Sequence, residues 1–100
     1  RGGMMLYWVM YDISENKSRN QAVKACKNKG LYRVQKSIFL GDLNKNQKDE
    51  LKIIMERLVD EDTDSIYIFP TSKDFIQDTD MIGNGFDREL VSNEIVSRFI

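Results

Sequence analysis

The chain has 100 residues, of which 41% are hydrophobic and 31% charged, and its formal net charge is −1. This composition is typical of a one-domain globular protein. A single cysteine excludes an internal disulfide framework, and no apolar stretch approaches the about 20 residues that a membrane span needs. Since histidine is absent, one chain cannot supply histidine-based nucleophilic catalysis or histidine metal ligands, so hydrolysis would use carboxylates, hydroxyls and a hard cation such as magnesium.

The first expected element is a strand from Met4 to Tyr11, an unbroken apolar run that ends at Asp12. Because the run is short and bounded by turn residues, it predicts a central strand buried on both faces. Asp12 would then lie at the carboxyl end of this strand, where it would have to be hydrogen-bonded, paired or metal-bound. Alternatively Asp12 caps the next helix, although Ser14 or Asn16 could cap it and leave Asp12 available for chemistry.

A helix is expected from Glu15 to Lys29, where Gly30 supplies a stop signal. Its thin apolar stripe consists of Ala22, Val23 and Cys26. Arg19 lies one turn before Val23 and therefore belongs to the inner edge of the helix, near the turn that carries Asp12. From there Arg19 could pair with Asp12 or bind a phosphate.

The neutral total hides a basic and an acidic half. Residues 13 to 41 hold seven basic residues and one acid, whereas residues 42 to 64 hold eight acids and four bases. The basic residues are Lys17, Arg19, Lys24, Lys27, Lys29, Arg33 and Lys36. They indicate either a solvated helix face or a phosphate-binding surface, and charge alone favours the solvated face.

Leu31–Leu40 alternates in polarity and predicts a second strand, broken at Gly41–Asp42. A second helix follows, with Asn44 as its cap and Gln47 in the capping-box position. Its apolar residues recur at helical spacing and are expected in the core: Leu51, Ile54, Met55, Leu58 and Val59.

Asp60–Asp64 is expected to form a solvated acidic turn, because it lacks the glycine and the spacing of a calcium loop. Ser65–Phe69 predicts a third strand that ends at Pro70. A short helix or turn should follow over Ser72–Thr79, and Met81–Gly83 is expected to form a short fourth strand.

The element order is βαββαβ if residues 31–43 contribute two paired segments, and βαβαβ otherwise. Two helices on one face would leave the other face of the sheet open and apolar. Its candidate residues are Tyr67, Phe69, Phe39 and alternate members of Met4–Tyr11. We expect a homodimer to bury this face. The tail at residues 86–100 would add an edge strand or a helix to the partner, through Ile95, Val96, Phe99 and Ile100.

Three stretches together resemble the small CRISPR-associated nuclease family, Cas2: Tyr11–Ser14, Arg19 and Arg33–Leu43. The resemblance implies an α+β, ferredoxin-like βαββαβ domain over residues 4–85, with an antiparallel sheet and two helices on one face. It also implies a face-to-face homodimer, to which residues 86–100 would contribute as a C-terminal extension.

By the same resemblance, Asp12 is the catalytic and metal-binding residue, and magnesium or manganese binds between the subunits. Arg19, Arg33 and Phe39 carry over as nucleic-acid contacts, with Ser37 as a polar helper. Some members have a second helix arginine where this chain has Gln21, which removes one phosphate contact. The family cleaves RNA or double-stranded DNA, and its dimer joins an integrase in inserting CRISPR spacers.

Three functions remain open from the sequence. The first is a metal-dependent phosphodiesterase centred on Asp12, and the second is a non-catalytic DNA-binding scaffold for spacer integration. The third is a ferredoxin-like RNA-binding or regulatory module, against which the absence of an aromatic RNA-binding signature argues. No basic–apolar secretory signal is apparent, so a cytoplasmic location is the expectation.

Overall fold

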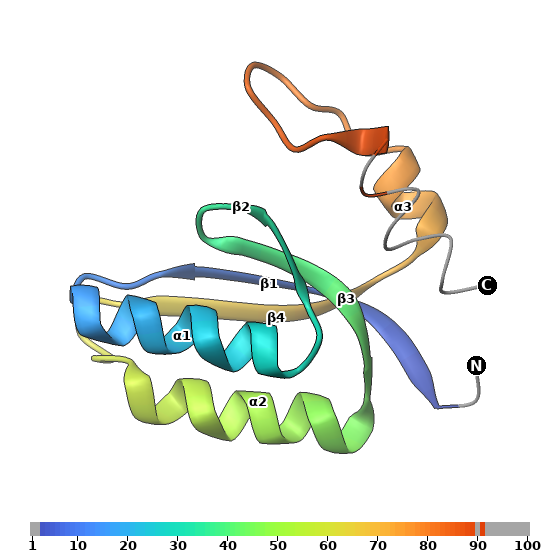
Figure 1. Ribbon diagram of the computed structural model, residues 1–100. Helices are drawn as coiled ribbons and strands as arrows, with labels where there is room; N and C mark the ends of the chain where they lie inside the picture. The colour runs from blue at the N-terminus through green and yellow to red at the C-terminus, as the bar shows by residue number, and fades with distance from the viewer. Residues whose placement is uncertain (1–2, 90, 92–100) are drawn as a thin grey trace.

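The computed structural model describes residues 3–89 and 91. Its elements are β1 (Met4–Asp12), α1 (Asn16–Asn28), β2 (Tyr32–Gln35), β3 (Ile38–Asn44), α2 (Lys45–Leu58), β4 (Ser65–Thr71) and α3 (Lys73–Gln77). All strand pairs are antiparallel and the sheet order is β2-β3-β1-β4, so β1 is internal, as expected. Helices α1 and α2 lie side by side on one face of the sheet, and α3 lies on the other (Figure 1). This arrangement confirms the ferredoxin-like βαββαβ order.

The region from Leu31 onward forms two strands and not one. β2 and β3 make a hairpin whose turn is Lys36–Ser37, with a register irregularity between Arg33 and Gln35. The expected break at Gly41–Asp42 is wrong, because β3 continues through both residues. Gly41 is needed there for space: a Cβ on it would lie 2.8 Å from Leu31 Cδ2 and 3.2 Å from Leu31 Cα. Glycine thus permits close packing of the chain onto the strand and does not end it.

The two long helices begin differently. At α1 the cap position is Glu15, whose side chain makes no capping hydrogen bond, so the expectation that Ser14 or Asn16 caps the helix is wrong. At α2 the predicted capping box is confirmed: Gln47 N donates to Asn44 Oδ1 at 2.8 Å, and Asn44 N donates to Gln47 Oε1 at 2.9 Å. The box satisfies two backbone donors at the start of the helix.

Helix α2 meets the sheet along a narrower face than its sequence predicts. Leu51 and Met55 are buried, and Leu58 and Val59 pack partly against the same core. Ile54 is 38% exposed, so its placement in the core is wrong. Because α1 covers part of the same face of the four-stranded sheet, α2 needs only a narrow stripe of residues, spaced three and four apart, to cover the rest.

β4 extends through Pro70, which was expected to end it. Pro70 pairs with Tyr7 at the edge of the sheet, where the outer side of the strand needs no hydrogen-bond donor. The helix after it is confirmed as α3, with Ser72 Oγ accepting a hydrogen bond from Phe75 N at 3.1 Å. The short strand expected at Met81–Gly83 is wrong: this segment is irregular, and Ile82 is 96% exposed.

The face opposite α1 and α2 is partly covered by the chain itself, which corrects the expectation of a fully open face. A second core joins Leu6, Trp8, Leu40, Ile76 and Val91. The ring of Phe86 adds to it, with its centroid 5.6 Å from that of Trp8. The boundary expected after residue 85 is therefore crossed by core contacts. The apolar residues expected at 95–100 lie outside the described residues.

Among the described strand residues of this face, the exposed large apolar side chains lie on β4, where Tyr67 is 62% and Phe69 is 37% exposed. Ile66 and Ile68 point to the opposite side and pack against the helix-side core. Across the described residues, no helix has the length and hydropathy that a bilayer crossing requires.

Candidate functional site

Asp12 ends β1 and is exposed, so it is not the buried carboxylate that the sequence suggested. It pairs with Ser65 of β4. Strand alternation places its side chain on the face of Trp8 and Met10, the face on which Tyr67 of β4 is exposed. A second copy docked on this face would therefore meet Asp12.

Within the described part of the chain, no hydrogen bond or ion pair engages the Asp12 carboxylate, and no three acidic or cysteine side chains gather into a metal site. The expected ion pair with Arg19 is therefore not formed. A lone exposed carboxylate suits magnesium or manganese, since such ions are held by one or two carboxylates and several waters. One copy of the chain supplies one such ligand.

Arg19 instead holds the loop after Asp12. Its Nη1 donates to Ile13 O at 3.1 Å and to Ser14 O at 3.2 Å. This confirms that Arg19 lies beside the β1–α1 turn, as its helical position predicted. The contact fixes the backbone of the two residues that follow Asp12.

Asp64 holds the same loop from the other side. Ser14 N donates to Asp64 Oδ1 at 3.0 Å, and Asp60 N donates to Asp64 Oδ2 at 3.0 Å. The backbone N–H of Asp60, then that of Ser14, hold the pKa of the Asp64 carboxyl below its usual range, so Asp64 stays ionised at neutral pH. The acidic turn is therefore more than the solvated loop that the sequence predicts, because it is hydrogen-bonded to Ser14, two residues after Asp12.

A basic pocket of about 290 Å³ lies between α1 and the β2–β3 turn. Its lining residues are Tyr11, Asn16, Arg19, Asn20, Val23, Arg33, Lys36 and Ser37. Three cations, two amides and a hydroxyl here can bind oxyanions by charge and by donated hydrogen bonds. The structure thus brings together three of the four residues expected to contact nucleic acid, namely Arg19, Arg33 and Ser37.

Lys36, Asn16 and Asn20 were not singled out from the sequence as site residues. The alternating pattern over residues 31–40 does not show where the chain turns, and the pocket requires Lys36 and Ser37 at that turn. Arg33 fixes this bend: its Nε and Nη2 donate to Lys36 O at 3.0 and 2.8 Å. The Arg33 guanidinium therefore fixes the turn that forms one wall of the pocket.

Phe39, the fourth expected contact, is fully buried at 0% exposure and belongs to the helix-side core. Its assignment to the open face is wrong, because the alternation of β3 turns it toward α1 and α2. Its ring stacks on Tyr11 with the centroids 6.3 Å apart, and Arg33 Cζ lies 6.0 Å from its centroid. A ring without exposed surface has no face to offer a base.

Below the basic pocket, the Tyr11 hydroxyl is buried without a hydrogen-bond partner in the described chain. Burial, and then the neighbouring Cys26 thiol, raise the pKa of Tyr11. Burial also raises the pKa of Cys26 to about 12, so this thiol stays protonated and unreactive. Neither group acts as an acid or base near neutral pH.

Asp12 and the basic pocket occupy the same end of the sheet but opposite faces. Tyr11 and Asp12 are neighbours in β1, so their side chains alternate, and Tyr11 lines the pocket while Asp12 faces away. Within one copy of the chain, Arg33 and Asp12 therefore lie on opposite faces of the sheet.

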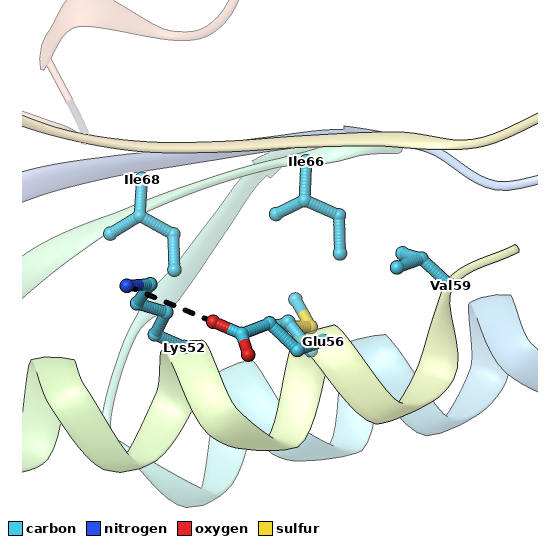
Figure 2. A pocket seen from close by; sticks show the side chains of 6 residues that line it. Lys52, Glu56, Val59, Ile66 and Ile68 are labelled. Atoms are coloured by element: carbon cyan, nitrogen blue, oxygen red, sulfur yellow. Dashed lines mark ion pairs between the residues drawn. The ribbon is translucent and has the colours of Figure 1, made fainter. Parts of the chain in front are cut away.

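An apolar groove of about 280 Å³ lies between α2 and β4 (Figure 2). Its walls are Met55, Val59, Ile66 and Ile68, and its two charged residues, Lys52 and Glu56, face each other at 3.8 Å. It offers no group for a reaction.

Comparison with known proteins agrees with this geometry. The family model for CRISPR associated protein Cas2 matches residues 5–78. A CRISPR-associated endoribonuclease Cas2 of Archaeoglobus fulgidus is 42% identical over 66% of this chain and 70% of its own length. A CRISPR-associated endoribonuclease Cas2 of Korarchaeum cryptofilum is 31% identical over 85% of this chain and 91% of its own length.

Solved structures with a similar fold include a Cas2 protein. The crystal structure of Streptococcus pyogenes Cas2 superposes with a TM-score of 0.68 at 26% identity, covering 79% of this chain and 100% of that one. A hypothetical protein from Thermus thermophilus superposes with a TM-score of 0.69 at 30% identity, covering 83% of this chain and 95% of that one. The motifs, the fold and these similarities agree, and the chain belongs to the CRISPR-associated Cas2 family.

Proposed function

We propose that this chain is a dimeric, metal-dependent endonuclease of CRISPR defence that acts on phosphodiester bonds of RNA or double-stranded DNA. The observation that carries the proposal is the exposed, unengaged Asp12 carboxylate at the end of a central strand, at the same end of the sheet as a basic pocket on the opposite face. The endoribonuclease names of the similar archaeal proteins support the reaction class.

In this proposal Asp12 and Asp12 of a second copy hold one magnesium or manganese ion. Bound there, the ion would supply Lewis-acid chemistry to a phosphodiester. Without it, two carboxylates brought together would repel each other, or one would be protonated. Arg19, Arg33, Lys36 and Ser37 bind backbone phosphates, and the strand of nucleic acid passes from this pocket around the end of the sheet to Asp12.

The dimer forms through the face that carries Tyr67, Phe69 and Asp12. We expect a solution mass twice that of the 11.7 kDa chain at micromolar concentration. Tyr67→Lys should shift the protein toward monomer, because Tyr67 is 62% exposed on this face. Ile53→Lys on the outer side of α2 should not, although Ile53 is 50% exposed. Sedimentation equilibrium measures all three, and a monomeric wild type would refute the dimer.

Nucleic-acid binding should depend steeply on salt and little on sequence, because the pocket offers charges to phosphates. Lys36→Ala should reduce the slope of log affinity against log salt by about one unit, since it removes one phosphate contact. The control is Lys48→Ala, whose ammonium lies 3.1 Å from Asp49 and outside the pocket. Fluorescence anisotropy on duplex DNA and on RNA across a salt series measures the slope. Equal slopes for wild type and both variants would contradict the phosphate contact.

A second candidate is a non-catalytic scaffold that binds DNA beside an integrase during spacer acquisition. It is favoured by the position of the basic pocket on the face of the sheet opposite Asp12, because the pocket can bind phosphates there without the Asp12 carboxylate. Cleavage measured with and without magnesium separates the two functions, because the scaffold binds DNA equally well but leaves it intact.

A further inference from the structure

The acidic turn between α2 and β4 is hydrogen-bonded to the loop that follows Asp12. Asp64 accepts hydrogen bonds at both carboxylate oxygens: Oδ1 from Ser14 N, and Oδ2 from Asp60 N, each at 3.0 Å. Thr63 Oγ1 also donates to Oδ1, at 3.0 Å. One side chain therefore links two loops that are 50 residues apart in the sequence.

The place of this link is specific. Asp64 immediately precedes Ser65, and Ser65 is the residue paired with Asp12 across β1 and β4. Ser14 lies two residues after Asp12, and its carbonyl is held on the other side by Arg19 at 3.2 Å. The turn after Asp12 is thus fixed at its N–H by a carboxylate and at its C=O by a guanidinium.

We infer that Asp64 is a positioning residue for Asp12: by holding Ser14 N, it fixes the turn after β1 so that the Asp12 carboxylate is presented to its cation in one orientation. This inference rests on the proposed metal-binding role of Asp12. Charge-assisted hydrogen bonds from backbone N–H groups to a carboxylate are strong, which suits Asp64 to this task. Displacing a functional group by about 1 Å can cost about 100-fold in rate.

The other acids of the turn do not share this role. Asp60 organises the turn internally: its Oδ1 accepts from Asp62 N at 3.0 Å and its carbonyl accepts from Asp64 N at 2.8 Å. The Asp62 side chain makes no hydrogen bond or ion pair within the described residues and is exposed. Asp62→Asn is therefore a matched control, with the same change of charge two residues from Asp64.

The test compares full-length Asp64→Asn, Asp64→Ala and Asp62→Asn with wild type. Asparagine keeps one acceptor oxygen and alanine keeps none, so Asp64→Asn should weaken the link to Ser14 and Asp64→Ala should remove it. If Asp64→Ala fails to fold, Asp64→Asn still tests the inference. Amide hydrogen exchange at Ser14 reports the link itself. Isothermal titration with Mn²⁺ alone reports cation binding at Asp12, and circular dichroism reports folding.

We expect Asp64→Asn to bind Mn²⁺ about tenfold more weakly, as is usual when a group that orients a metal ligand is lost. Asp64→Ala should be weaker still, and Asp62→Asn should match wild type. Faster Ser14 exchange with unchanged Mn²⁺ affinity would overturn the inference and leave the proposed function intact. A folded wild type that binds no Mn²⁺ would overturn both.

Discussion

Asp12→Asn is expected to lower metal-dependent cleavage by at least about 100-fold, because several kcal/mol of transition-state stabilisation by a cation are lost with its ligand. Asparagine keeps the shape of aspartate but cannot balance the charge of a divalent ion. Folding should be preserved, since Asp12 is exposed and no described hydrogen bond or ion pair holds its side chain. Cleavage of RNA and of duplex DNA over a magnesium series measures the effect.

The matched control is again Asp62→Asn, which removes an exposed carboxylate from the neighbouring turn. Every preparation needs the same purification, because traces of a contaminating nuclease would imitate a weak activity. Full cleavage by Asp12→Asn would contradict the catalytic role of Asp12, assign the activity elsewhere and leave the scaffold function standing. Loss of DNA binding as large as the loss of cleavage would show that Asp12 acts through structure.

The sequence predicted the parts of this fold that depend on local patterns. The apolar run from Met4, the Asn44–Gln47 capping box and the α2 stripe at Leu51 and Met55 each follow from periodicity or capping chemistry. The resemblance to the Cas2 family then settled what alternation left open, because a continuous alternating pattern over residues 31–40 does not reveal where a hairpin bends.

Long-range contacts account for what could not be predicted. The burial of Phe39 depends on which face β3 turns toward the helices, and the hairpin bend at Lys36–Ser37 sets that face. The hold of Asp64 on Ser14 joins residues 50 apart, and acidic-turn composition alone gives no sign of it. Likewise, Phe86 covers Trp8 through a segment with no regular periodicity.

The basic pocket could be predicted only in part. Helical spacing correctly placed Arg19 on the inner edge of α1, and three of the seven basic residues of the basic half line the pocket. That Arg19 meets Arg33 and Lys36 around one cavity depends on the packing of α1 against the hairpin. The opposite orientation of Asp12 follows from strand alternation once the strand is known to include residue 12.

Phe39→Ala is expected to destabilise the fold by about 3–5 kcal/mol, the usual cost of removing a fully buried aromatic ring. Phe39 is 0% exposed and contacts Tyr11 within the helix-side core, so its loss leaves a cavity beneath both long helices. Urea unfolding at a fixed protein concentration measures the change, since dimer formation makes the apparent stability depend on concentration.

The control is Phe75→Ala, because Phe75 on α3 is 70% exposed and should change stability by about 0.5 kcal/mol or less. The same pair of variants decides whether Phe39 is also a nucleic-acid contact. If it only supports the fold, Phe39→Ala should bind duplex DNA as well as wild type at a low temperature at which circular dichroism shows it folded. A folded Phe39→Ala that has lost DNA binding would contradict a purely structural role: either the ring positions Arg33 of the basic pocket, which lies over it, or the core opens in the complex.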